Sequence, residues 1–436
     1  MPLICGHDAP AYGLPLCEHL RAATATGSPL DHRTYYVGKG VERYRICGPC
    51  RNEKTVTASP VCEECFDAAE GSPAGVVGQP ETLEAPRPVG GEVETTDLPS
   101  DAGRVFDVAP TRGGLLLLDE EGRILLWETG ARTCRELARG SVTVPDGSEP
   151  WCGRVQTRRL HASRDGAFAA VVIDYGRHGE VYDLSSGAVT LALENDGYHS
   201  DTVPFSLAFA EHDGRNVLLH RRQWSLIEAV DPATGEVLAA MPVEEERTDW
   251  SGYFQGALHL SPGGTRIASD AWCWQPFGRP VAWNLGQWLT EGEGAWKSGN
   301  GWAALPPCEY YWNRPMAWLD EDRIVIGGLG EDEEEIVPGA RVFDVSRVET
   351  DQWGHRNPVE AATFGGPEGA LFSADGLLFS AGADGLDIWD PVAGARTGSI
   401  PGFVPTHHDA LAGHLLAFDP ARGTIRRWST SGSRRR

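Results

Sequence analysis

The feature that most constrains this 436-residue chain is a pattern that recurs from about Arg104 onward. Each recurrence has an apolar run, a turn with Asp or Gly, a second run that ends in a large apolar residue followed by a polar one, and a tight turn. Period-two alternation in such runs predicts strands. Seven anchor pairs stand 39 to 60 residues apart: Trp127-Glu128, Tyr182-Asp183, Val230-Asp231, Trp283-Asn284, Phe343-Asp344, Trp389-Asp390 and Trp428-Ser429. This repetition predicts one structural unit for each pair, packed against its neighbours.

The repeats resemble those of WD-repeat and quinoprotein-like β-propellers, and DGLDIWDPVAG, at 384–394, is the best match. The resemblance implies an all-β chain with a seven-bladed β-propeller over residues 102–430. The Gly-His dipeptide that opens a WD blade is missing from most repeats, so the number of strands in each blade stays open. Two β-sandwiches are the alternative fold.

The last repeat is one strand short before the basic tail, 431–436, which we expect to be disordered. Either GEVETTDL (91–98) or RVFDVAP (104–110) is able to supply the strand that closes the ring. Closure of this kind removes the exposed edge strands.

Residues 1–66 differ in character, because they are poor in aliphatic runs and hold possible soft metal ligands in pairs. One or two residues separate the members of each pair, and two spacers let both thiolates of a knuckle reach one zinc ion at about 2.3 Å. A redox Cys-x-x-Cys is disfavoured because CGPC is followed by polar loop residues, and disulfides are disfavoured in a reducing compartment. The eight predicted metal ligands are Cys5 and His7, Cys17 and His19, Cys47 and Cys50, and Cys62 and Cys65.

The order of these pairs resembles that of the cross-brace zinc modules of RING, B-box and ZZ type. The resemblance implies one ion held by Cys5, His7, Cys47 and Cys50, and a second held by Cys17, His19, Cys62 and Cys65. Four protein ligands leave no open position, so both zinc sites are expected to be structural. A segment this small needs the metal as a source of folding free energy.

Charge and composition exclude several function classes. The net charge is −24, and residues 1–66 balance seven bases against seven acids, so binding to nucleic acid is disfavoured. No apolar run of about 20 residues occurs and the start does not read as a signal peptide, so we expect no membrane contact and a cytoplasmic location. Abundant Arg with only three Lys suggests a bacterial, GC-rich genome.

Residues 67–101 carry eight acids and one base, which predicts an acidic Pro/Gly-rich linker.

Between Asp270 and Asp320 lie eight of the fifteen Trp residues. We expect a long insertion between the fourth and fifth blades, helical at LGQWLTEG at most, that packs on a face of the propeller. Trp283 and Trp318 are expected in blade cores. Aromatic side chains are enriched in interface hot spots, so the candidate partner-binding residues are Trp296, Trp302, Tyr310, Tyr311 and Trp312.

Two polar segments are expected to be ordinary loops. GEDEEEIVPG lacks the ligand spacing of an EF-hand, and in THHDALAGH the adjacent His and Asp residues point in different directions. The chain has no nucleophile elbow, phosphate loop or His-Glu-x-x-His motif. These observations favour a non-catalytic scaffold or adaptor that binds a protein partner. The alternative is a propeller enzyme, or a small-ligand-binding protein that uses the central channel.

Overall fold

The computed structural model describes most of the chain after residue 90 and parts of the segment before it. The described ranges are 14–26, 32–37, 42–47, 58–61, 91–145, 154–241, 253–273, 276–292, 294–297, 302–350 and 356–430.

Seven sheets in the described residues share one antiparallel order in which each strand pairs with the next. The first sheet has β6 (Val105–Thr111), β7 (Gly114–Asp119), β8 (Arg123–Trp127) and β9 (Arg135–Arg139). The second has β10 (Thr157–Ala162), β11 (Phe168–Asp174), β12 (His178–Asp183) and β13 (Ala188–Glu194). The third has β14 (Leu207–His212), β15 (Arg215–Gln223), β16 (Leu226–Val230) and β17 (Val237–Ala240).

The remaining four sheets continue the series. The fourth has β19 (Leu258–Leu260), β20 (Arg266–Ser269), β23 (Val281–Asn284) and β24 (Trp302–Ala304). The fifth has β26 (Met316–Trp318), β27 (Arg323–Leu329), β28 (Val337–Thr350) and β29 (Arg356–Gly365). The sixth has β30 (Ala370–Ala374), β31 (Leu377–Gly382), β32 (Gly385–Asp390) and β33 (Ala395–Pro401). The seventh has β34 (His407–Asp409), β35 (His414–Asp419), β36 (Thr424–Ser429) and β5 (Glu94–Asp97).

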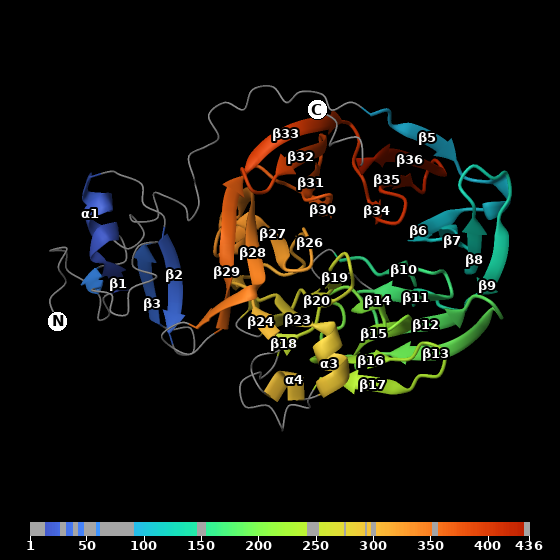
Figure 1. The fold of residues 1–436 in the computed structure, drawn as a ribbon, viewed down its shortest axis with the longest axis horizontal. Helices are drawn as coiled ribbons and strands as arrows, with labels where there is room; N and C mark the ends of the chain where they lie inside the picture. Colours follow the sequence, from blue (N-terminus) through green and yellow to red (C-terminus); the bar gives the residue numbers. More distant parts are fainter. Residues whose placement is uncertain are drawn as a thin grey trace.

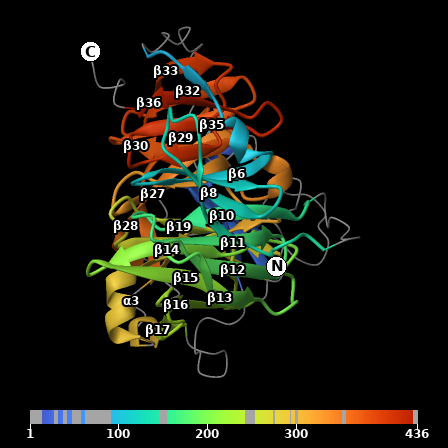
Figure 2. The ribbon, with the colours of Figure 1, turned by 90° about the vertical axis from the view of Figure 1, so that its right-hand side faces the viewer.

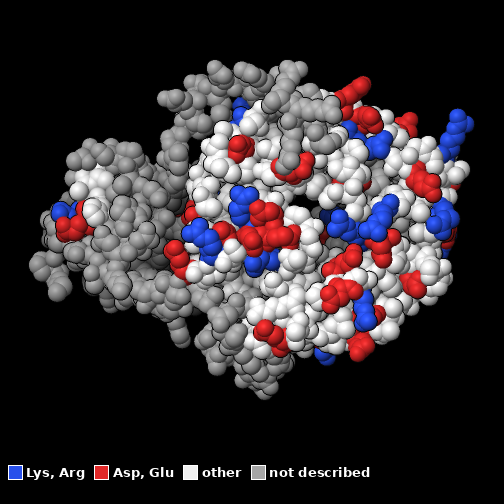
Figure 3. Space-filling model, in the orientation of Figure 1, with Lys and Arg blue, Asp and Glu red and all other residues white. Residues whose placement is uncertain are grey.

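The sheets stand side by side around a central axis (Figure 1). The first strand of each sheet is innermost, and β34 contacts β6, which contacts β10, and so on through β14, β19, β26 and β30. The space-filling view shows an opening at the axis (Figure 3). The predicted all-β propeller class is therefore confirmed, and the two-sandwich alternative is wrong because the sheets surround an axis.

The anchor pairs explain why each sheet forms where it does. All seven anchor residues, from Trp127 to Trp428, are at most 3% exposed and lie in the cores between neighbouring sheets. In three pairs the acid that follows turns the chain: the carboxylates of Asp183, Asp231 and Asp390 accept hydrogen bonds from backbone N–H groups two or three residues on. Such Asx turns favour the tight hairpin that leads to the outermost strand. Asp344 accepts the N–H of Ser346 in the same way, but at a bulge inside β28.

The ring is closed by the N-terminal strand β5, which pairs with β36 from Glu94↔Arg427 to Asp97↔Thr424. Leu98 also donates its backbone N–H to the carbonyl of Gly423 at 2.8 Å. Of the two predicted closing segments, GEVETTDL therefore supplies the strand, whereas RVFDVAP forms the innermost strand β6. Closure leaves β36 without an unpaired edge, as expected.

The segment THHDALAGH is a hairpin, so its assignment as a loop is wrong. His407–Asp409 form β34, and His414 begins β35. The hairpin escaped notice because two His residues and an Asp do not alternate in hydropathy. His407 contacts the buried Asp107 of β6, with 3.1 Å between Nε2 and Oδ1. This contact ties the last sheet of the ring to the first.

Asp107, in the first sheet, contacts polar groups of the second and seventh sheets. Its Oδ2 accepts the backbone N–H of Leu160 at 2.8 Å, and the Arg159 guanidinium lies 3.5 Å from its Oδ1 and 3.1 Å from Asp174. Burial by itself would raise the pKa of Asp107, but the hydrogen bond with His407 and the charge of Arg159 outweigh burial and leave it below its usual value.

An eighth, smaller sheet has the order β18-β21-β22-β25 and stands beside the fourth sheet of the ring. Its strands are β18 (Tyr253–Phe254), β21 (Trp272–Cys273), β22 (Phe277–Gly278) and β25 (Cys308–Glu309). Two helices, α3 (Leu285–Glu291) and α4 (Gly294–Lys297), follow β23, and Figure 2 places α3 on one face of the ring.

The N-terminal segment forms a separate sheet of order β2-β3-β1-β4. Its elements are β1 (Leu14–Cys17), α1 (Glu18–Thr26), β2 (His32–Val37), β3 (Glu42–Cys47) and β4 (Ala58–Val61). Among the side chains described in this segment, the buried apolar ones include Leu16, Leu20 and Val61. Among the described residues, no helix combines the length and the apolar character needed to cross a membrane.

Protonation of Asp107 is expected to weaken the ring closure. Because its pKa is lowered in the folded state, its contribution is present above the ordinary pKa of about 3.8 and is lost as the pH falls through the lowered value. Asp107→Asn should reduce the free energy of unfolding at pH 7 by about 1.5–3 kcal/mol and flatten its pH dependence below pH 4. Urea unfolding followed by Trp fluorescence measures both effects. The control, Asp213→Asn at an exposed turn, should behave as wild type; equal losses in both variants would contradict the role of Asp107.

Candidate metal centre and aromatic surface

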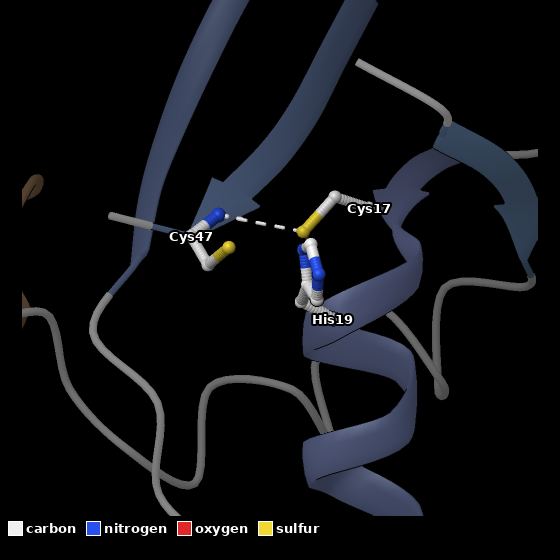
Figure 4. Close-up of side chains that lie close together, drawn as sticks. All are labelled: Cys17, His19 and Cys47. Carbon is white, nitrogen blue, oxygen red and sulfur yellow. Dashed lines mark hydrogen bonds between the residues drawn. The ribbon is translucent and has the colours of Figure 1, made fainter. Parts of the chain in front are cut away.

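Three soft ligands meet in the N-terminal sheet. The sulfur atoms of Cys17 and Cys47 and a ring nitrogen of His19 all lie within 4.8 Å of one another. Figure 4 shows the two thiols and the imidazole ring converging from β1, β3 and the start of α1. Both cysteines are fully buried and neither forms a disulfide, whereas His19 is exposed.

Local topology produces this convergence. Strands β1 and β3 are parallel, with Leu16 opposite Arg45, so their final residues Cys17 and Cys47 emerge at the same edge. Helix α1 starts immediately after Cys17 and carries His19 in its first turn. The backbone N–H of Cys47 donates to Cys17 Sγ at 3.4 Å and links the ends of the two strands.

The donor set fits a soft divalent metal, because thiolate and imidazole are the ligands that zinc prefers. Of the eight predicted ligands, the structure brings together Cys17, His19 and Cys47. The side chains of Cys5, His7, Cys50, Cys62 and Cys65 lie outside the described residues. The observed grouping joins the second pair to the third, whereas the cross-brace resemblance joins the third pair to the first.

A cluster of aromatic rings is centred on the small eighth sheet, which supplies Phe254 from β18 and Trp272 from β21. Trp272 stacks on Phe254 with 4.0 Å between ring centroids and on Trp312 with 5.2 Å. Tyr198 stacks on Phe254 at 5.5 Å and meets Trp224 edge to face at 5.7 Å. We call these five residues the aromatic platform. Trp272 and Phe254 are buried, and Tyr198 is 56% exposed at its surface.

The predicted insertion, 286–315, carries Trp312 of this platform and is only partly where it was expected. Its first part, with α3, α4 and β24, lies within the fourth sheet, and only 305–315 lie between the fourth and fifth sheets. Trp302 begins β24 and pairs with Trp283 of β23, which makes β24 the outermost strand of that sheet. The sequence did not predict β24 because WAA has only three residues and shows no alternation of apolar and polar side chains. The predicted helix at LGQWLTEG is confirmed as α3, and Trp283 and Trp318 are buried as expected.

Asn284 explains where the insertion begins. It holds the position that an acid holds in most anchor pairs, but its side-chain oxygen accepts the N–H of Gln287 at 2.7 Å and caps α3. Asn at this position therefore starts a helix where the second, third and sixth sheets make a tight hairpin.

The five predicted partner-binding residues do not form one surface. In an antiparallel sheet, successive connections lie at opposite ends. The connection from β23 to β24, with Trp302 at its end, is therefore on one face of the ring, and the connection from β24 to β26, with Tyr310, Tyr311 and Trp312, is on the other. Trp302 is half-buried against the core, Trp312 joins the aromatic platform, and Tyr310 is 53% exposed. The side chain of Trp296 lies outside the described residues.

Sequence reasoning missed Tyr198 and Trp224. They come from connections of neighbouring sheets, NDGYHSDT and RRQWS, where single aromatic residues stand in polar surroundings. No local pattern in the sequence indicated that these connections contact the insertion. In the structure they do, since Asn313 Nδ2 donates a hydrogen bond to the Thr202 carbonyl oxygen at 3.2 Å.

An acidic loop borders Tyr310. The backbone N–H of Glu309 donates to the carbonyl of Glu331 at 2.7 Å, and Glu309 bridges to Asp332. Glu333 and Glu334 are exposed, but the expected loop GEDEEEIVPG is only partly irregular, because Glu333–Glu335 form a 3-10 helix and β28 begins at Val337. Exposed aromatic rings and carboxylates are therefore neighbours on this face.

Beneath the aromatic platform lies a buried carboxyl group, Asp270. Its Oδ2 accepts the backbone N–H of Arg314 at 2.8 Å. Burial raises the pKa of Asp270 to about 7, against the opposing charge of the buried Arg314. A group that is half-protonated near neutral pH is able to exchange a proton, but Asp270 is 1% exposed.

A polar cavity of about 280 Å³ lies on the sixth sheet. Arg396 and Asp387 line it and form an ion pair with 3.3 Å between Nη1 and Oδ2. Because the charges of Arg396 and Asp387 neutralise each other, this ion pair attracts a charged small molecule only weakly.

Comparison with known proteins adds little to this description. No family model matches the sequence, and no curated protein matches it. Among solved structures, a chain from one described as "Crystal Structure of Mitotic Checkpoint Complex" is similar, with 12% sequence identity and a TM-score of 0.46. The match covers 81% of this chain and 96% of that one. A similarity this low carries no argument, so the fold assignment rests on the sheets themselves.

Asp270 should make the protein less stable as the pH rises. Between its ordinary pKa of 3.8 and the folded value of about 7, the folded state holds a proton that the unfolded state has released. The free energy of unfolding therefore falls as the pH rises through this window and levels off above it. Asp270→Asn retains an acceptor for Arg314 and should remove this part of the dependence between pH 5 and 8. Urea unfolding at several pH values measures it, with the exposed Glu211→Gln as control. A pH profile unchanged by Asp270→Asn would refute the raised pKa.

Proposed function

We propose that the chain is a non-catalytic scaffold that binds a protein partner through the aromatic platform and the neighbouring Tyr310. In this proposal the seven sheets are the seven blades of a WD-like propeller, and the N-terminal segment is a module stabilised by structural zinc. The observation that carries the proposal is the pair of exposed rings, Tyr198 and Tyr310, on a face where buried rings hold the surface rigid.

Aromatic rings that are fixed in place are effective anchors for a binding partner. Large rings that are held in place lose little conformational entropy on binding and supply much contact area, which is why they dominate interface hot spots. Tyr198 is held by its contacts with Phe254 and Trp224. The acidic loop next to Tyr310 and the net charge of −24 favour a partner with a basic binding segment.

The alternative, an enzyme or small-ligand protein that uses the central channel, has its best support in the Asp107 cluster. There the carboxylate is already engaged by His407, Arg159 and the Leu160 N–H. A base or acid in a reaction needs an oxygen free to meet the substrate. The cluster is better suited to fastening the ring, which favours the scaffold.

The zinc proposal predicts a defined metal content. Full-length protein purified without chelator should contain about two zinc ions per chain by elemental analysis, since four ligands complete each structural site. Removal by EDTA should expose the N-terminal thiols to alkylation and leave Trp fluorescence unchanged, because all fifteen Trp residues follow residue 101. One ion per chain would limit the proposal to a single site, and protein without zinc would contradict it.

The partner proposal predicts that Tyr198→Ala with Tyr310→Ala abolishes binding without unfolding the ring. Loss of two hot-spot rings costs about 2 kcal/mol or more, or about 30-fold in affinity. The measurement is a pull-down from a lysate of the source organism, with wild type and variant as baits, followed by titration of the retained protein at rising salt.

The matched control is Val392→Ala, which truncates an apolar side chain that is 77% exposed on the sixth sheet. It should bind as wild type. Trp302 and Trp312 are unsuitable for this test because both pack against buried side chains. A partner that binds the double variant and wild type equally would place the interaction elsewhere, and binding that strengthens with salt would contradict a basic partner.

A further inference from the structure

A phenyl ring is exposed where the first and second sheets of the propeller meet. Phe106 is the second residue of β6, and 38% of its surface is exposed. Val105 and Val108 of the same strand are buried and pack between the first and seventh sheets. Strand β6 contacts β10 of the second sheet beside the axis (Figure 1). The Phe106 side chain therefore points away from the core in which its strand neighbours lie.

Two guanidinium groups lie over this ring. The Cζ atom of Arg104, which directly precedes β6, is 5.3 Å from the ring centroid of Phe106. The Cζ atom of Arg158, the second residue of β10, is 4.7 Å from the same centroid. Both distances are within the range of a cation–π interaction. Arg158 also donates from Nη2 to the carbonyl oxygen of Glu120 at 3.3 Å. These contacts hold two positive charges, one from each of two neighbouring sheets, close to one ring.

Neither of these two cations has a carboxylate partner in the part of the chain that the structure describes. Arg159, the next residue of β10, differs from them because it is paired with both Asp107 and Asp174. Arg158 is half-buried, and its partial burial lowers its pKa. An Arg side chain nevertheless stays charged at neutral pH. A cation that has lost part of its hydration and lacks a counterion gains free energy when an anion binds to it.

We propose that Arg104, Phe106 and Arg158 form a second docking surface, which binds an acidic segment of a protein partner. We call these three residues the arginine surface. Each guanidinium group presents a planar fork of N–H donors that matches a carboxylate. Contacts with the ring position both forks before binding, which reduces the entropy lost when the partner binds. Arginine and aromatic side chains are also enriched in interface hot spots.

An acidic peptide fits the arginine surface better than a nucleic acid does. Binding to nucleic acid depends on many phosphate contacts, and the net charge of −24 repels a phosphate backbone along its whole length. A short acidic segment places its carboxylates on the two guanidinium groups and presents little charge to the rest of the protein.

The arginine surface lies on the same face of the ring as the aromatic platform. Phe106 and Arg158 each follow a connection from an outermost to an innermost strand, and Tyr198 lies in a connection of the same kind, from β13 to β14. In antiparallel sheets of one strand order, such connections lie at the same end. The inference goes beyond the proposed function, because the arginine surface binds a separate segment whose charge is opposite to that expected at the platform. A partner that carries both segments is held in one orientation.

Peptide binding to the full-length protein tests the arginine surface. The probe is fluorescein-labelled hexaglutamate, followed by anisotropy at about 0.15 M salt, where repulsion by distant charges is largely screened. Arg104→Ala with Arg158→Ala should weaken binding about tenfold or more, because hydrogen bonds to charged groups are lost. The matched control, Arg112→Ala with Arg164→Ala, removes the same charge from two exposed residues in connections on the other face. The control should bind hexaglutamate as wild type does.

Phe106→Leu separates the role of the ring from that of the charges. This variant keeps both arginines and an apolar side chain, and it should weaken binding about two- to fivefold through loss of the cation–π contacts. Binding equal to that of wild type would remove the ring from the proposed surface. Trp fluorescence reports whether each variant is folded.

Three results would overturn the arginine surface as a whole. They are equal losses in the two double variants, no binding of hexaglutamate by wild type, and tighter binding of a single-stranded oligonucleotide of the same length. Tyr198→Ala with Tyr310→Ala should bind hexaglutamate as wild type does. Failure of the arginine surface is therefore distinguishable from failure of the aromatic platform, which is measured by the pull-down.

Discussion

The pairing of β5 with β36 is the interaction on which the rest of the ring depends. Without it the seventh sheet would have three strands, and the two ends of the propeller would not be joined by a shared sheet. The closing strand comes from the residues before the first sheet, so both ends of the propeller meet in one sheet. The contact between His407 and Asp107 fastens the same junction at the innermost strands.

A single local solution builds several of the sheets, and the fourth sheet departs from it. A large apolar residue enters the core and an acid then turns the chain by accepting backbone N–H groups. Where Asn284 replaces the acid, its side chain caps a helix and the chain leaves the regular path. The aromatic platform forms on the opposite face of the ring, where Phe254 of β18 and Trp272 of β21 meet Trp312 and the connections that carry Tyr198 and Trp224.

The fold was predictable from the sequence because its signals are local. Period-two alternation and the anchor pairs indicated the repeats, and the missing strand of the last repeat pointed to GEVETTDL or RVFDVAP, between which the structure decided. The candidate site was less predictable. Trp302 proved to be an outermost strand residue, Trp312 is stacked on Trp272, and THHDALAGH pairs as a hairpin. Short strands of two or three residues carry too few positions for a period to be recognised.

By itself the sequence determined which residues are large and apolar, where the chain turns, and that the N-terminal segment holds soft ligands in pairs. These properties depend on neighbours within a few positions. Only the tertiary structure decided which connections share a face, which rings become a platform, and that Cys47 approaches Cys17 and His19. Such contacts depend on strand order and register, and a parallel pairing such as β1 with β3 leaves no trace in the spacing of the residues that it brings together.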